Sequence, residues 1–162
     1  MASHSLEHRI AALEAIEAIR RVVGTYAHGA DRRNDPAIMS GLFHDDGVWE
    51  AEGFGRREGR DEIVAHLAAI AAREITWSLH YMVSPVVELD EDLRQASCHW
   101  YLWELAQVAS PGQAPRPHWM AGWYRSRLRR QGDAWRFSHV RLELQLVHAS
   151  AEAWVLMRQS SH

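Results

Sequence analysis

The chain has 162 residues, 47% of them hydrophobic and 24% charged, which suits one globular domain with a buried core and excludes a disordered segment. Its net charge of −3, from 18 basic and 21 acidic residues, argues against binding to nucleic acid. The single cysteine, Cys98, excludes an internal disulfide, and no apolar stretch is long enough for a membrane span or signal peptide. We expect one cytoplasmic domain over residues 1–162, with its core at about 6–148.

The first half of the chain is predicted to be mostly helical. Apolar residues at positions 6–30 recur every three or four residues, which predicts a long helix with one buried stripe. Asp35 and Pro36 predict the N-cap and first residue of a second, short helix. A turn then leads into a short strand at 48–52, and a third helix follows with Asp61 as its cap.

The second half of the chain has the composition and alternation of strands. Prolines in the segment 110–117 predict a longer loop that cannot pair, and residues from 150 onward are expected to form a short helix or tail. Helices followed by antiparallel strands are typical of an α+β fold, whose curved sheet wraps around the helices and leaves one open end. The four long strands are expected at residues 76–89, 95–109, 118–130 and 134–148.

Tyr26 and Asp31 lie about 140° apart around the first helix, on the two edges of its buried stripe. A carboxylate is disfavoured near a helix C-terminus, so Asp31 is expected to have a partner. In the strand that follows the third helix, His80 faces away from Trp77 and Tyr81, toward the expected inner side. An Asp31–His80 pair would form a general base, and the Tyr26 hydroxyl would donate to a departing or developing oxygen. The alternative is a solvated Asp31 in the last helical turn.

The last strand, "WRFSHVRLELQLVH", separates into two faces. Arg141 shares one face with Trp135 and Phe137, and it either polarises a substrate oxygen or halide or pairs with Glu143 or Glu104 at a subunit contact. The opposite face is expected to form a core or, as an apolar outer surface, the interface of a homo-oligomer. That face carries Val140, Leu142, Leu144 and Leu146.

Four segments resemble the nuclear transport factor 2-like superfamily, and within it the SnoaL-like branch. They are "IRRVVGTYAHGADRRN", "LFHDDGVWE", "GRDEIVAHL" and the terminal Trp-x-Phe-x-His strand. The resemblance implies a cone-shaped α+β barrel, in which a mixed, mostly antiparallel sheet wraps around three helices. The branch contains polyketide cyclases, bile-acid and scytalone dehydratases, a lindane dehydrochlorinase and ketosteroid isomerases.

The resemblance also implies a set of catalytic residues. Asp31, His80 and Arg141 match the pattern of the dehydratase and dehydrochlorinase members, and Tyr26 matches a tyrosine of bile-acid dehydratases where the dehydrochlorinase has a lysine. The implied function is a cofactor-independent lyase that dehydrates or dehydrohalogenates an apolar cyclic substrate. The alternatives are an isomerase or polyketide cyclase, and a non-catalytic binding module or oxygenase β-subunit-like protein. The dehydratase-like relatives favour a homotrimer over a dimer.

The eight tryptophans predict either an aromatic core or a pocket for a flat apolar ligand. The 11 histidines are scattered, with no ligand spacing that predicts a metal site. The sequence leaves open whether His99, Trp103 and Glu104 line the pocket or face a neighbouring subunit. The candidate substrate-binding residues are Trp49, Trp103, Trp119, Trp123, Phe137 and His139.

Overall fold

The structure is a computed structural model that describes residues 5–156. Its first half holds three helices, α1 (Leu6–Asp31), α2 (Pro36–Met39) and α3 (Arg60–Arg73). The Asp35 carboxylate accepts a hydrogen bond from the Ala37 backbone N–H at 2.9 Å, which confirms it as the N-cap of α2. The expected cap of α3 was wrong, because the helix begins at Arg60 and its N-cap is Gly59, two residues before Asp61, with no side-chain cap hydrogen bond.

Six strands form one curved sheet in the order β2-β1-β6-β5-β4-β3. All neighbouring pairs are antiparallel except β1 and β6, which run parallel. The α+β fold expected from the sequence is therefore confirmed, with an unclosed mixed sheet. The strands span β1 (Phe43–Ala51), β2 (Gly55–Glu58), β3 (Ile75–Leu89), β4 (Gln95–Ser110), β5 (Gln113–Gln131) and β6 (Ala134–Ala149).

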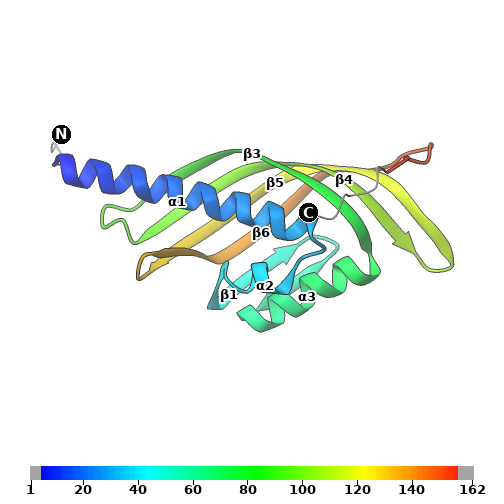
Figure 1. Cartoon of the computed structure of the whole chain (residues 1–162), viewed down its shortest axis with the longest axis horizontal. Coiled ribbons are helices and arrows are strands. Elements are labelled where there is room, and N and C mark those ends of the chain that lie inside the picture. Colours follow the sequence, from blue (N-terminus) through cyan, green and yellow to red (C-terminus); the bar gives the residue numbers. More distant parts are fainter. Residues whose placement is uncertain (1–4, 157–162) are drawn as a thin grey trace.

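The helices lie along one side of the sheet. Helix α1 runs across the strands and contacts β3 and β6, while α3 packs against β1, β2 and β3 (Figure 1). The buried stripe of α1 includes Ile19, Val23 and Tyr26, each at most 2% exposed. The first turns of α1 extend beyond the strands, and this leaves Leu6 and Leu13 about two-thirds exposed, at 67% and 66%. The expected stripe is thus buried only in its C-terminal part.

Three further expectations from the sequence differ from the structure. The segment 110–117 is not a loop, because β4 and β5 pair from Ser110 with Gln113 onward and a tight turn at Gly112 joins them. Pro117 sits within β5, opposite Gln107. The short β2 was not expected, and residues 150–156 form no helix, while the rest of the expected terminal helix lies outside the described residues. No helix in the described part is long and apolar enough to cross a membrane.

Candidate active site

A cavity of about 50 Å³ lies between α1, α3 and the inner face of the sheet. Most of its wall is apolar, and its polar groups come from facing elements. No arginine or lysine among the described residues lines it. The apolar residues include Ala30, Trp49, Phe54, Leu67, Ile70, Met120 and Leu142, and the polar ones are Tyr26, Asn34, Ser78, His80, Glu104 and Tyr124.

Asp31 and His80 meet at the edge of this cavity. Asp31 Oδ1 accepts two hydrogen bonds of 2.8 Å, one from the backbone N–H of His80 and one from its ring Nδ1. An ionised carboxylate only accepts, so Nδ1 carries the proton and Nε2 is left as the basic nitrogen. The two bonds to one oxygen fix both the backbone and the ring of His80. The structure therefore brings together the pair expected from the sequence, from residues 49 positions apart in the chain.

Glu104 is the polar residue whose place the sequence had left open. It lies on β4 directly opposite His80 on β3, and its side chain is only 3% exposed. Its Oε1 is 3.5 Å from His80 Nε2, without the geometry of a hydrogen bond, and has no other partner among the described residues. The signal that could have found it is the alternation of β4, in which Glu104 continues the inward series of Trp100 and Leu102.

Burial and the charges of Asp31, His80 and Glu104 together raise the pKa values of both His80 and Glu104. Burial lowers the pKa of His80, but the carboxylate of Glu104 and the hydrogen bond and charge of Asp31 outweigh it, so the pKa is raised. Burial raises the pKa of the Glu104 carboxyl, which His80 offsets only in part. Both groups thus hold protons more strongly than in water, and they titrate as a pair. No group of three or more His, Cys, Asp or Glu in residues 5–156 is arranged to hold a metal ion.

Tyr26 presents a hydroxyl to the same cavity. Its oxygen accepts a 2.9 Å hydrogen bond from the indole N–H of Trp49 and a further one from Tyr124. Burial raises the pKa of Tyr26 to about 12, so the phenol stays protonated at neutral pH. Because two donors already occupy the oxygen, the Tyr26 proton remains free to be donated to a third group in the cavity.

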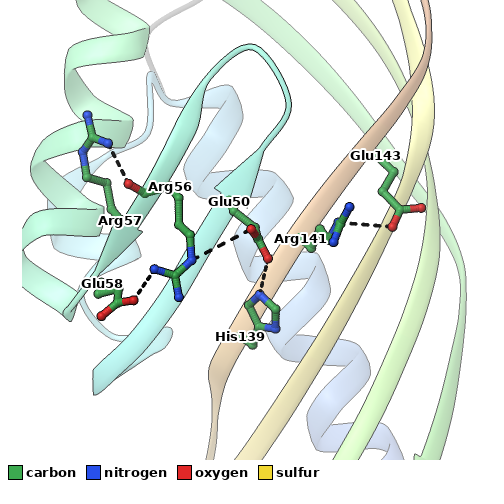
Figure 2. A network of polar contacts seen from close by, with 7 residues as sticks. All are labelled: Glu50, Arg56, Arg57, Glu58, His139, Arg141 and Glu143. Atoms are coloured by element: carbon green, nitrogen blue, oxygen red, sulfur yellow. Dashed lines mark hydrogen bonds and ion pairs between the residues drawn. The ribbon is translucent and has the colours of Figure 1, made fainter.

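Arg141 does not reach the cavity, so its expected contact with substrate is not present, and it takes the alternative expected from the sequence, a pairing with Glu143. An extra residue on β6 between Phe137 and His139 interrupts the pairing with β5, so the alternation of faces changes there. Leu142 therefore points inward, and Arg141 points outward with a side chain that is 56% exposed. It pairs with Glu143 at 3.3 Å on the outer side of the sheet, with α1 behind the strands (Figure 2).

The same alternation explains why most of the expected substrate-binding residues lie elsewhere. Of these, Trp49 lines the cavity, whereas Phe137 is fully buried in the aromatic core and His139 bonds to Glu50 on the outer face (Figure 2). Of the apolar face of β6 that was expected to be a core or an outer interface, Val140 and Leu142 are buried in the core and Leu144 packs against it, whereas Leu146 is exposed. The other three tryptophans of the set, Trp103, Trp119 and Trp123, alternate with inward residues of β4 and β5 and do not line the cavity.

A sequence model of the SnoaL-like domain matches residues 11–141. The chain belongs to the SnoaL-like family. This confirms the resemblance inferred from the four sequence segments. No curated protein sequence matches the chain significantly.

Solved structures similar to this SnoaL-like protein include several enzymes. A hexachlorocyclohexane dehydrochlorinase, LinA type 2, has 15% identity and a TM-score of 0.82 over 91% of this chain and 97% of its own. The LinA type 3 enzyme from Novosphingobium barchaimii LL02 has 16% identity and a TM-score of 0.82 over 93% and 99%. A protein described as a scytalone dehydratase from Novosphingobium aromaticivorans DSM 12444 has 17% identity and a TM-score of 0.73 over 94% and 99%. At these identities the comparisons establish the shared fold.

Proposed function

We propose that this SnoaL-like protein is a lyase that eliminates a small group from an apolar cyclic substrate, with Asp31 and His80 as its general base. The observation that carries the proposal is the pair of hydrogen bonds that Asp31 Oδ1 accepts from His80, one from the ring Nδ1 and one from the backbone N–H. A carboxylate that holds Nδ1–H stabilises the imidazolium that forms when Nε2 takes a proton from carbon. Relatives that share the fold, a dehydrochlorinase and a protein described as a scytalone dehydratase, support this class of reaction.

The protons and electron pairs of the proposed elimination are all accounted for without a cofactor. His80 Nε2 removes a proton from a carbon made acidic by a neighbouring electron-withdrawing group. The electron pair of that C–H bond forms a C=C bond, and the bond to the leaving group on the next carbon breaks with its own electron pair. Tyr26, still protonated at neutral pH, donates a hydrogen bond to oxygen on which negative charge develops. Each of these roles requires only a short-range contact inside the cavity.

The walls of the cavity suit an apolar ligand, but its volume is small. About 50 Å³ holds a few water molecules, whereas drug-sized ligands occupy pockets of roughly 300–1,000 Å³. A cyclic substrate would therefore require lining side chains to move. Phe54 is suited to this, because it sits in the turn between β1 and β2, flanked by Gly53 and Gly55 with φ of 83° and 90°.

An isomerase on the same scaffold is the second candidate, and the buried Glu104 favours it. A carboxylate beside a general base can return the proton to a different carbon, so that nothing leaves the substrate. Product analysis separates the two functions, since elimination releases water or halide and isomerisation conserves the mass of the substrate.

We further propose a homo-oligomer, a trimer in preference to a dimer, in which copies cover the outer face of β3 and β4. This face exposes large apolar side chains that a monomer would leave in water. Light scattering of the purified protein measures the oligomeric state, and a monomer at micromolar concentration would contradict this. The exposed residues are Leu79, Tyr81, Val83, Val86, Tyr101 and Trp103, at 36–58%.

The test of the proposed function uses two probe substrates, 3-hydroxycyclohexanone and γ-hexachlorocyclohexane. Enone absorbance and chloride release report elimination. His80→Ala and Asp31→Asn should each lower turnover by about 100-fold or more, the scale of general-base catalysis. His99→Ala, which removes a histidine outside the cavity, is the matched control and should keep wild-type turnover. Full activity in His80→Ala would contradict the proposed base.

A further inference from the structure

The least expected group in the cavity is the carboxyl of Glu104. Burying an ionised carboxylate without a partner is costly, so such a group either binds a proton or pairs with a cation. The described residues that line the cavity include no arginine or lysine. Within residues 5–156, the one group able to carry positive charge beside Glu104 Oε1 is the His80 ring, at 3.5 Å. His80 and Glu104 therefore hold one proton as a pair, either on His80 Nε2 or on the Glu104 carboxyl.

The neighbours of Glu104 on every side restrict where that proton can go. His80 lies opposite it on β3, Met120 lies opposite it on β5, and Tyr124 also lines the cavity from β5. From α1 come the Asp31 carboxylate, already occupied by His80, and the Tyr26 hydroxyl. α3 contributes only apolar side chains to the cavity wall. The proton can therefore move between Glu104 and His80, or to a molecule in the cavity.

We propose that Glu104 is the catalytic acid of this site, and that it protonates a leaving hydroxyl group, so that the substrate is a β-hydroxy carbonyl compound that loses water. This rests on the proposed elimination with His80 as base. In the active form His80 is neutral at Nε2 and Glu104 carries the proton. His80 takes the proton from carbon, the C=C bond forms, and the C–O bond breaks as Glu104 gives its proton to the departing oxygen, which leaves as water.

After this step the pair holds the same single proton in its other arrangement, an imidazolium facing a carboxylate. Transfer of that proton from His80 Nε2 to Glu104 Oε1, which are 3.5 Å apart, restores the starting state without a proton from solvent. The proton balance of each cycle is therefore closed inside the site: one proton arrives from carbon and one departs in water.

The charge of the cavity also favours water over halide as the product. Halide leaves as an anion and is best received by a cation, but Arg141 lies on the outer face and no other arginine or lysine of the described chain lines the cavity. Neutral water needs no such cation, provided that a proton donor is in place.

A matched pair of substrates tests the acid role. 3-Hydroxycyclohexanone and 3-chlorocyclohexanone give the same enone, but only the hydroxyl group needs a proton to leave. Glu104→Gln should lower turnover of the hydroxy ketone by about 100-fold or more and that of the chloro ketone by less than about tenfold. Glu88→Gln, an exposed glutamate on β3, is the control and should change neither. Equal losses on both ketones, or full activity of Glu104→Gln on the hydroxy ketone, would overturn the proposal. So would a wild-type enzyme that turns over the chloro ketone but not the hydroxy ketone.

A measurement without substrate decides the protonation state. Infrared spectra at neutral pH should show the C=O band of a protonated carboxyl, shifted in D2O, absent in Glu104→Gln and present in Glu88→Gln. Absence of that band in the wild type overturns the acid role. Failure of the base is distinguishable from failure of the acid, because His80→Ala should lose turnover of both ketones while Glu104→Gln loses only that of the hydroxy ketone.

Discussion

The Tyr26 hydroxyl lines the cavity and also accepts hydrogen bonds within the buried core, and the substitution Tyr26→Phe removes only that hydroxyl. The residue is 2% exposed, and its ring packs edge-on against Phe137 and Tyr124, with centroids 5.8 Å away in each case. Phenylalanine retains the ring and these contacts. What it removes is the acceptor for the indole N–H of Trp49, 2.9 Å away, and for the hydroxyl of Tyr124.

The expected cost follows from the two donors that are left without a partner. A buried donor that loses its acceptor costs about 1–3 kcal/mol. The Tyr124 hydroxyl can rotate and recover part of this, whereas the Trp49 indole is fixed by its ring, so we expect a loss of roughly 2–4 kcal/mol. For a domain of this size that corresponds to a fall in Tm of roughly 4–16 °C.

Urea unfolding of four proteins measures this cost: the wild type, Tyr26→Phe, Trp49→Phe and the double variant. The double-mutant cycle should give a coupling energy of about 1–3 kcal/mol between the two side chains. Thr25→Val removes a hydroxyl that is exposed on α1 and should change stability by less than about 0.5 kcal/mol. A Tyr26→Phe protein as stable as that control, or additive effects in the cycle, would refute the reasoning.

Three further predictions concern the sheet and the titrating pair. In Gly122→Ala the new Cβ would lie 2.2 Å from the backbone oxygen of Glu143, so we expect a loss of at least about 3 kcal/mol in urea unfolding; near-wild-type stability would contradict the close approach of β5 and β6. Because the pKa values of Glu104 and His80 are raised, the folded state binds more protons than the unfolded state, so stability should fall as pH rises past their ordinary values of 4.5 and 6.5. The fall should be at most about 1.4 kcal/mol per pH unit for each extra proton. Glu104→Gln should make the pH dependence of the unfolding midpoint less steep, and an unchanged dependence would contradict the raised pKa values of the pair. Arg141→Ala should change stability by less than about 0.5 kcal/mol and turnover far less than His80→Ala does, because the side chain is exposed; a loss of activity equal to that of His80→Ala would contradict its outward position.

The order of elements could be predicted from the sequence because it depends on periodicity, which is local. The stripe of α1, the N-cap at Asp35 and the four long strands all follow from the side-chain pattern. The bulge after Phe137 has no such signature, and it reverses the face on which Arg141 lies. The prolines of β5 were likewise misjudged, since Pro117 is tolerated in the sheet despite having no N–H to pair.

The Asp31–His80 pair could be anticipated because a carboxylate near a helix C-terminus and an inward histidine each need a partner. Glu104 could not be assigned so directly, because its role depends on which strand lies beside β3. Once β4 is placed there, a charged residue in an inward apolar series and opposite His80 becomes conspicuous. The number of tryptophans does not predict which of them line the cavity. Only the strand register distinguishes Trp49, which lines it, from Trp103 on the outer face.

The most direct test of the account is the protonation of the two ring nitrogens of His80. Nitrogen-15 NMR of histidine-labelled protein, assigned with His80→Ala, distinguishes a ring nitrogen that bears hydrogen from one that does not. At a pH where the ring is neutral, we expect hydrogen on Nδ1, which Asp31 holds at 2.8 Å, and none on Nε2. Asp31→Asn should lose this preference. Hydrogen on Nε2 in the wild type, or the same tautomer mixture in both proteins, would contradict the claim that Asp31 prepares His80 as a base.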